Sequence, residues 1–223
     1  MAVGTLPAID ILVLCTGNIC RSPVAEALLR HRLEALGVPA HVHSAGLLAA
    51  GNPAHGTGID ILWARGHDMS AHRSTTMSPE LLNGADLILG MAREHVREAV
   101  VMAMGAWPRT FTLKELVRRG EVVGPRRPGE EVGQWLVRAH AGRTPSDLMG
   151  SSPADDVKDP IGLARTVYEQ VADEIDSFVG RLVGLAWPDE SGGARPSPAG
   201  ADAGSAPAPQ RVAPRPAGSE WRS

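Results

Sequence analysis

An apolar run that ends in a cysteine constrains the fold of this chain more than any other feature. The run Ile9-Asp10-Ile11-Leu12-Val13-Leu14 has the length and composition of a buried strand, and Cys15-Thr16-Gly17-Asn18-Ile19-Cys20-Arg21-Ser22 follows it directly. Ser22 is a helix-capping residue type, and Pro23 suits a first helical turn. The sequence therefore predicts a strand, a short loop and a helix, with the loop amides and the helix N-terminus forming an anion cradle.

Two side chains of the octapeptide predict chemistry at this cradle. A thiol beside a helix N-terminus loses its proton readily, which makes Cys15 a candidate nucleophile. The planar fork of Arg21 is suited to holding two oxygens of a phosphate group. The alternative is structural: Cys15 is a buried cysteine at a strand end, and Ser22-Pro23 only begins a helix.

The other loop residues have physical roles of their own. We expect Gly17 to permit a backbone turn that a Cβ would hinder, and the Asn18 side chain to hydrogen-bond across the loop. Ile19 offers an apolar wall to a substrate ring. The Ser22 hydroxyl would stabilise negative charge on the sulfur of Cys15.

The motif continues into Pro23-Val24-Ala25-Glu26-Ala27, and the whole stretch resembles the active-site signature of the low-molecular-weight protein-tyrosine phosphatases. The resemblance covers most of residues 8–187 and suggests a bacterial, actinobacterial-like member. It implies that Cys15 carries a phosphocysteine intermediate and that Arg21 clamps the phosphate, with no cofactor and no metal. It also implies a phosphate-binding loop made of Thr16, Gly17, Asn18, Ile19, Cys20 and Ser22.

A general acid is needed because the leaving group would otherwise depart as an alkoxide or phenoxide. The family resemblance points to an Asp-Pro pair near the end of the domain, and Asp159-Pro160 matches it. Asp159 would protonate the leaving oxygen and then accept a proton from the water that attacks phosphocysteine. We interpret the nearby Asp155 and Asp156 as solvated loop charges.

The chain departs from the family pattern on both sides of the expected pocket. Many relatives follow Asp-Pro with tyrosines, whereas this chain has Ile161 and Gly162, and its only tyrosine is Tyr168. Relatives often place an aromatic residue after the segment Ser44-Ala45-Gly46, where residues 47–53 here are without one. We therefore expect an apolar pocket rim with looser selectivity for phosphotyrosine.

Two further positions match supporting features of the family. The resemblance implies that Ser44, at the end of the second strand, hydrogen-bonds the phosphate loop. It places His72 in the same supporting network, although a surface histidine is the alternative. His41 and His43 share one face of the second strand. They could bind a metal as a pair, but we favour a half-exposed strand face.

Composition restricts the class of protein. The net charge is −3 over 223 residues, which gives no electrostatic footprint for nucleic acid. No apolar run approaches a membrane span, and the N-terminus lacks a signal-peptide pattern, so we expect a cytoplasmic protein. Its expected partner is a phosphotyrosine-containing protein, such as a bacterial tyrosine kinase.

The cysteine count bears on redox chemistry. The chain has only two cysteines, Cys15 and Cys20, and both lie in the loop motif. A disulfide framework is therefore excluded. A reversible disulfide between the two would shield the nucleophile from over-oxidation, which makes redox sensitivity a hypothesis for this site.

The hydrophobic pattern predicts an α/β fold. Strands are predicted at residues 9–14, 40–44, 86–90 and 109–111. Helices are predicted at residues 23–36, 57–65, 94–104 and 164–185. Alternating strands and helices indicate a parallel sheet covered on both faces, and the family resemblance implies four parallel strands in the order 2-1-3-4 with phosphatase I-like, flavodoxin-like topology.

Two segments fall outside this core. Residues 120–155 form an insertion within the phosphatase domain of residues 1–187, with a short amphipathic helix expected around Trp135, Leu136 and Val137. We hypothesise that the insertion is a lid or docking flap over the site, with a passive surface insertion as the alternative. Residues 188–223 are rich in Pro, Ala and Gly and are expected to be disordered.

Three other functions compete with phosphotyrosine hydrolysis. Arsenate reduction with a small-molecule thiol is one, because arsenate resembles phosphate. Phosphoarginine hydrolysis is another, but members with that activity resemble this motif with threonine where this chain has Ile19. A non-catalytic phosphopeptide-binding module is the third, and it would need neither the Cys15 thiol nor the Asp159 acid.

Overall fold

The computed structural model describes residues 8–188, and the predicted tail lies outside this range except for Pro188. The strands are β1 (Ile9–Cys15), β2 (Ala40–Gly46), β3 (Leu87–Gly90) and β4 (Thr110–Thr112). The α-helices are α1 (Arg21–Ala35), α2 (Gly56–Ala64), α3 (Pro79–Gly84), α4 (Arg93–Met102), α5 (Leu113–Val123), α6 (Val132–His140) and α7 (Arg165–Ala186). Two short 3₁₀ helices, η1 (Met104–Arg109) and η2 (Pro145–Leu148), complete the set.

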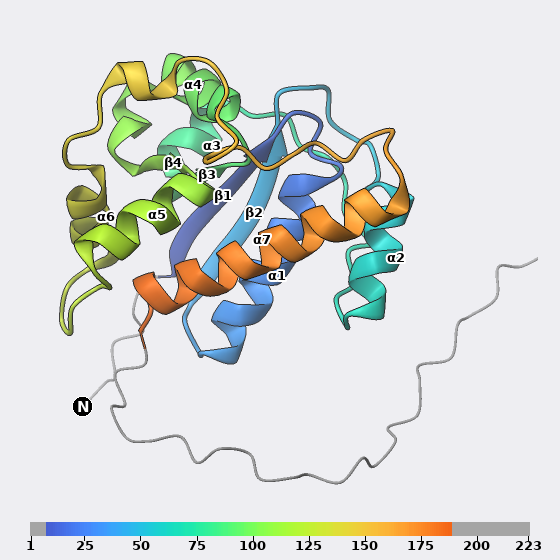
Figure 1. The fold of residues 1–223 in the computed structure, drawn as a ribbon, viewed down its shortest axis with the longest axis horizontal. Coiled ribbons are helices and arrows are strands. Elements are labelled where there is room, and N and C mark those ends of the chain that lie inside the picture. Colours follow the sequence, from blue (N-terminus) through green and yellow to red (C-terminus); the bar gives the residue numbers. More distant parts are fainter. Residues whose placement is uncertain (1–7, 189–223) are drawn as a thin grey trace, which may run out of the picture. The chain divides into compact units, whose positions relative to one another are not determined.

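The four strands form one parallel sheet in the order β2-β1-β3-β4 (Figure 1). This confirms the predicted fold class and strand order. In the register, Cys15 at the end of β1 lies beside Gly46 at the end of β2. The loop after β1 therefore opens at the carboxyl edge of the sheet, where parallel α/β sheets bind ligands.

Helices cover both faces of the sheet, because side chains alternate along each strand. Ile11 and Val13 of β1 pack into a cluster with α1, α5 and α7. Leu12 and Leu14 pack on the other face with α3, α4 and η1. These two apolar clusters fix β1 from both sides, and with it the starting point of the loop that follows.

The long helix α7 runs across the face that α1 also covers (Figure 1). Its apolar stripe, with Val171, Ile175, Val179 and Leu182, is buried as the helical spacing predicts. The segment before α7 passes over the carboxyl edge of the sheet and carries Asp159 toward the loop after β1.

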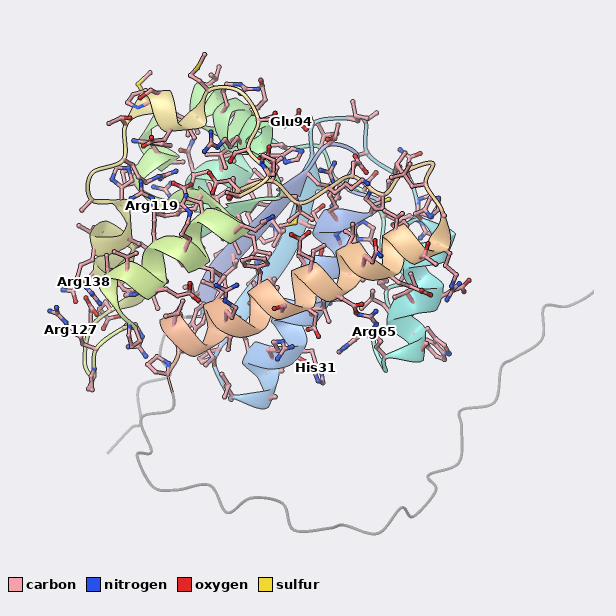
Figure 2. The ribbon with its side chains drawn as sticks, viewed as in Figure 1. His31, Arg65, Glu94, Arg119, Arg127 and Arg138 are labelled. Carbon is pink, nitrogen blue, oxygen red and sulfur yellow. The ribbon has the colours of Figure 1, made fainter. Side chains whose placement is uncertain are left out.

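Helix α6 of the insertion does not cover this edge. Trp135 of α6 is fully buried, and its indole nitrogen donates to the Gly124 carbonyl at 3.0 Å. A cavity of about 910 Å³ lies beside α6 and is lined by Leu136, Ile9 and Asp86, so α6 packs near the starts of β1 and β3. Figure 2 shows Arg138 of α6 far from Glu94, whose carboxylate accepts a hydrogen bond from Thr16 of the loop after β1. The lid hypothesis is therefore wrong for α6.

The residues after α6 return toward the site. Arg97 of α4 donates to the Leu148 carbonyl at 3.1 Å, and Arg93 donates to the Met149 carbonyl at 3.3 Å. The second half of the insertion is thus anchored on α4, beside the loop edge. Within residues 8–188, no helix has both the length and the apolar character needed to cross a membrane.

Candidate active site

The loop between β1 and α1 is shaped by one residue with a left-handed backbone. Asn18 has φ +50°, a conformation that asparagine tolerates better than most residues. Gly17, which the sequence predicts to be the required glycine, has ordinary space: a Cβ there would meet Ile19 Cγ1 at 3.4 Å. The prediction for Gly17 is therefore wrong, and Asn18 takes the special conformation instead.

The glycine that the loop requires is Gly46, at the end of β2. A Cβ at Gly46 would lie 2.8 Å from both the Asn18 nitrogen and the Thr16 oxygen. The Thr16 carbonyl also accepts hydrogen bonds from the amides of Leu47 at 2.8 Å and Leu48 at 3.1 Å. The loop is thus packed directly against the backbone that follows β2.

Asn18 joins the loop to two neighbouring segments. Its side-chain nitrogen donates to the hydroxyls of Ser22 at 2.9 Å and Ser44 at 2.7 Å. Its side-chain oxygen accepts from the Thr75 amide at 2.8 Å. The ring Nε2 of His72 lies 2.7 Å from the Asn18 carbonyl oxygen. The structure therefore places both Ser44 and His72 against Asn18.

The Cys15 sulfur lies at the floor of the loop and is almost fully buried. It accepts hydrogen bonds from the Asn18 amide at 3.2 Å and the Ser22 hydroxyl at 2.9 Å. Helix α1 begins at Arg21, one residue before Ser22. The expectation that Ser22 caps the helix is wrong, because its hydroxyl is directed at the sulfur. Both donors and the helix N-terminus favour negative charge there.

Arg21 is 4% exposed and reaches across the loop mouth. Its Nη2 donates to Asp159 Oδ2 at 2.5 Å and to Thr16 Oγ1 at 3.2 Å, while Nη1 donates to the Val157 carbonyl at 3.3 Å. Its buried Nε has no hydrogen-bond partner among the described residues. A buried guanidinium nitrogen without a partner is costly, so this N–H is suited to an incoming anion.

Asp159 comes from a segment 138 residues away from Arg21 in the sequence. Its side chain is 46% exposed, so a substrate can approach the carboxylate from solvent. Its Oδ1 accepts from the Ile161 amide at 3.2 Å, two residues on. The Val157 amide donates to the Met91 carbonyl at 2.7 Å and ties this segment to the end of β3.

The two acidic residues upstream of Asp159 are structural. Asp155 is 3% exposed and accepts from Arg93 at 2.6 Å and Arg118 at 2.9 Å. Burial alone would raise the pKa of Asp155, but the two guanidinium groups outweigh it and hold the pKa below its ordinary value. Asp156 Oδ1 accepts from the Arg93 amide at 2.8 Å. The interpretation of these residues as solvated loop charges is wrong, because they anchor the segment that carries Asp159.

Cys20 differs from Cys15 in its surroundings. It is buried beside Tyr168, and burial raises the pKa of the Cys20 thiol to about 11. Cys20 is therefore a neutral thiol at physiological pH and a poor nucleophile. Both cysteines are free thiols, and a disulfide between them stays a hypothesis.

A buried histidine under the loop is invisible to sequence reasoning. His95 of α4 has no exposed surface, and its Nε2 lies 3.0 Å from Thr16 Oγ1, the same oxygen that accepts from Arg21. Burial and the nearby charge of Arg21 lower the pKa of His95 to about 3. His95 is thus a neutral support for Thr16 and Arg21. No spacing rule connects residue 16 with residue 95, so only the fold reveals the contact.

Among residues 8–188, the exposed side chains that we assign to the rim of the site are aliphatic. Leu48 is 59% exposed and Ile161 is 49% exposed, and both belong to segments bonded to the loop or to Asp159. Ile19 is half-buried, and its carbonyl accepts from the His55 amide at 2.8 Å. The only tyrosine, Tyr168, is buried under the loop and takes no part in the rim.

Comparison with known proteins places this geometry in one family. A family model described as low molecular weight phosphotyrosine protein phosphatase matches residues 10–131. The chain is 30% identical to a protein-arginine-phosphatase of Bacillus subtilis (strain 168), over 78% of this chain and 93% of that protein. It is 35% identical to the low molecular weight protein-tyrosine-phosphatase Etp of Escherichia coli (strain K12), over 55% of this chain and 80% of that protein. A crystal structure of a low molecular weight protein tyrosine phosphatase from T. tengcongensis aligns with TM-score 0.60 at 31% identity, covering 79% of this chain and 98% of that one.

Proposed function

Because this chain belongs to the low-molecular-weight phosphotyrosine protein phosphatase family, we propose that it hydrolyses phosphotyrosine in proteins through a phosphocysteine intermediate. The observation that carries the proposal is the convergence of three groups from two distant parts of the chain. The sulfur of Cys15 lies under the loop, and Arg21 lies across its mouth, 2.5 Å from Asp159. A nucleophile, an anion clamp and a proton donor are the groups that this reaction requires.

In the first step, the Cys15 thiolate attacks phosphorus and the bond to the leaving oxygen breaks. The phosphate oxygens would bind to the loop amides and to the guanidinium of Arg21, whose Nε is free to donate. Negative charge spreads over these oxygens in the transition state, so donors fixed by the fold stabilise it. Asp159 supplies the proton that the leaving oxygen takes up.

In the second step, water attacks the phosphorus of phosphocysteine. Asp159, now a carboxylate, accepts a proton from that water, the S–P bond breaks, and the Cys15 thiolate is restored. The Ser22 hydroxyl, 2.9 Å from the sulfur, stabilises the thiolate both before the first step and as the leaving group of the second.

The ion pair between Arg21 and Asp159 must open during this cycle. In the structure the Asp159 carboxylate accepts from Arg21 Nη2, so a phosphate oxygen that binds this nitrogen would have to displace it. A phosphate dianion would displace it, because it presents two oxygens to the guanidinium fork instead of one. A carboxyl group next to a phosphate dianion favours its protonated form, which is the form a general acid needs.

The first experiment is hydrolysis of an aryl phosphate in the presence of EDTA by the parent, Cys15→Ser and Asp159→Asn proteins. We expect activity in the parent, none in Cys15→Ser and a strong loss in Asp159→Asn. Asp173→Asn is the matched control, because the side chain of Asp173 is 68% exposed on α7 and pairs with Arg65. Equal losses in the two aspartate variants would contradict the role of Asp159. An inactive reduced parent would favour arsenate reduction or phosphopeptide binding.

A second candidate substrate is phosphoarginine, which one observation favours. A relative that matches most of the length of both chains, from Bacillus subtilis (strain 168), is named a protein-arginine-phosphatase. Against this, the half-buried aliphatic side chain of Ile19 suits an aromatic ring better than a charged guanidinium.

The choice between the two substrates is tested by kcat/KM on matched phosphotyrosine and phosphoarginine peptides. We expect the parent to prefer phosphotyrosine and Ile19→Thr to shift the ratio toward phosphoarginine. Ile19→Val keeps an apolar wall and serves as the control. A parent that prefers phosphoarginine would reassign the substrate while leaving the roles of Cys15 and Arg21 intact.

The expected protein partner is a phosphotyrosine-containing protein, such as a bacterial tyrosine kinase. The exposed side chains of Leu48 and Ile161 beside the site would contact residues flanking the phosphotyrosine. Dephosphorylation of an autophosphorylated kinase by the parent, and by Leu48→Ser, would show whether this rim contributes to protein substrates.

A further inference from the structure

A second cluster of reactive side chains lies at the other end of the sheet. Asp10 of β1 pairs with His41 of β2, and His43 follows two residues later on the same strand face. Cys15 lies five residues beyond Asp10, which is about 17 Å along the strand. The cluster is therefore separate from the phosphate loop.

The donor atoms of the three side chains lie close together. Nδ1 of His41 lies 2.8 Å from one carboxylate oxygen of Asp10, and Nε2 of His43 lies 2.8 Å from the other. The two rings are stacked with centroids 4.6 Å apart. All three donor atoms lie within 4.8 Å of one another. Two imidazole nitrogens and a carboxylate are the donor set of many transition-metal sites.

The backbone holds Asp10 in this position from the opposite side. Its amide donates to Asp86 Oδ2 at 2.9 Å, and its carbonyl accepts from the Asp86 amide at 2.8 Å. Parallel pairing with β2 fixes the positions of both histidines relative to it. A ligand set fixed by sheet register requires little rearrangement on binding, which lowers the entropic cost.

The cluster is accessible and carries charge suited to a cation. The side-chain exposure is 30% for Asp10, 21% for His43 and 66% for His41, so an ion can enter from solvent. The carboxylate of Asp10 supplies an oxygen ligand of negative charge, which suits a cation.

A second histidine pair in the same chain provides the contrast. The rings of His31 and His67 have centroids 4.7 Å apart, a separation close to that of His41 and His43. Within residues 8–188, neither of these rings is hydrogen-bonded to a carboxylate. Proximity of two imidazoles thus occurs here without a third ligand, and the carboxylate is what distinguishes the Asp10 cluster.

We propose that Asp10, His41 and His43 form a binding site for a divalent transition-metal ion, with Zn²⁺ as the reference ion. The ion replaces the hydrogen bonds between the carboxylate and the rings, and three protein ligands leave a fourth position for water. An imidazolium releases its ring proton on binding, whereas a neutral ring needs only to present its lone pair. The ion would join the edge strand β2 to β1 and has no part in phosphoryl transfer.

The test is calorimetric titration of Zn²⁺ into the full chain carrying Cys15→Ser and Cys20→Ser, which removes competing thiolates. We expect one ion per chain. In the same background, His41→Ala/His43→Ala and Asp10→Asn should each weaken binding by at least about 100-fold, since they remove ligands themselves. His31→Ala/His67→Ala is the matched control, because it removes two paired imidazoles and should leave binding unchanged. His31 lies on α1 (Figure 2), and His67 lies in the loop after α2.

Two further readouts keep the outcome clear. Zn²⁺ should raise the thermal midpoint of the control variant and not that of His41→Ala/His43→Ala. Co²⁺ should give visible d–d absorption bands in the thiol-free protein. Aryl phosphatase activity of His41→Ala/His43→Ala with both cysteines intact would show that this variant folds. Binding that survives removal of both histidines, or no saturable binding at micromolar Zn²⁺, would overturn the proposal.

Discussion

Asn18 is the residue on which the shape of the phosphate loop depends. Its side chain bonds Ser22, Ser44 and the Thr75 amide, and its carbonyl lies against His72. These partners come from three segments, so one buried amide ties α1, β2 and the segment after α2 together. The left-handed backbone at Asn18 also aims its own amide at the Cys15 sulfur.

Asn18→Ala should therefore reduce both the stability of the protein and its catalytic activity. Loss of three buried side-chain hydrogen bonds should cost about 2–4 kcal/mol of stability. The displaced loop should lower kcat/KM on an aryl phosphate by about 100-fold. Denaturant unfolding and steady-state kinetics measure the two effects, with the exposed Asn83→Ala as the control. A kcat/KM within a factor of about three of the parent value, in place of the expected loss, would contradict this role.

His95 gives the site a defined response to acid. Its pKa is about 3 in the folded protein against an ordinary value of 6.5. Between these values the unfolded chain binds a proton that the folded chain does not. The contribution of His95 to the free energy of unfolding is therefore fully present above pH 6.5 and is lost as pH falls from 6.5 toward 3. The slope from this residue is about 1.4 kcal/mol per pH unit.

His95→Gln removes this titration, so its stability should depend less on pH than that of the parent. The measurement is the free energy of unfolding of both proteins between about pH 4.5 and 7. The difference in free energy of unfolding between the parent and the variant should shrink as pH falls. A constant difference across this range would show that His95 titrates normally.

The loop motif identifies Cys15 and Arg21 as candidate site residues, and the family resemblance adds Asp159. Sequence reasoning does not reveal the contact between Thr16 and His95, because that contact depends on how α4 packs under the loop. Sequence reasoning also assigns Asp155 to solvent, although guanidinium groups from α4 and α5 bind it in the folded protein. Local patterns identify groups that react, whereas long-range packing decides which groups support them.

At the scale of elements, the two helices missed by sequence analysis are α3 and α5. Helix α3 is only six residues long, although Ser78 caps it and Pro79 begins it. Helix α5 follows β4 without a loop, with Thr112 serving both as the last strand residue and as the helix cap. Where no turn residues separate two elements, the change of hydrophobic period is difficult to detect.

Helix α6 packs against the core of the molecule through Trp135. Trp135 is fully buried and packs against Gly120 of α5, where an added Cβ would meet its ring at 2.8 Å. Arg138 adds hydrogen bonds to Glu130 and to the Val123 carbonyl, both at 2.7 Å. These contacts hold α6 against the core, away from the loop after β1.

Trp135→Ala should lower the free energy of unfolding by about 3–5 kcal/mol while leaving kcat/KM of the folded enzyme unchanged. Val137→Ala on the same helix is the control, because Val137 is 65% exposed and should change stability by no more than about 0.5 kcal/mol. Urea unfolding and aryl phosphate kinetics at a permissive temperature measure both. A specific loss of kcat in well-folded Trp135→Ala would restore the lid hypothesis for α6.

At the scale of the whole molecule, the parallel sheet separates two regions of chemistry. The carboxyl edge carries Cys15, and the segment before α7 carries Asp159 to it (Figure 1). The starts of β1 and β2 carry the Asp10 cluster, and the cavity beside α6 lies next to the starts of β1 and β3. The sheet fixes each group at its own edge, so we expect phosphoryl transfer and the proposed metal binding to be independent.

The central claim is that phosphate passes through Cys15, and trapping the phosphoenzyme tests it most directly. In Asp159→Asn, nitrophenolate can leave without an acid, but the attacking water lacks its base, so the intermediate should accumulate. Rapid denaturation after mixing with 4-nitrophenyl phosphate, followed by peptide mass spectrometry, should place the phosphate on Cys15. Continued hydrolysis with no phosphate on the protein, or phosphate on another residue, would contradict the account.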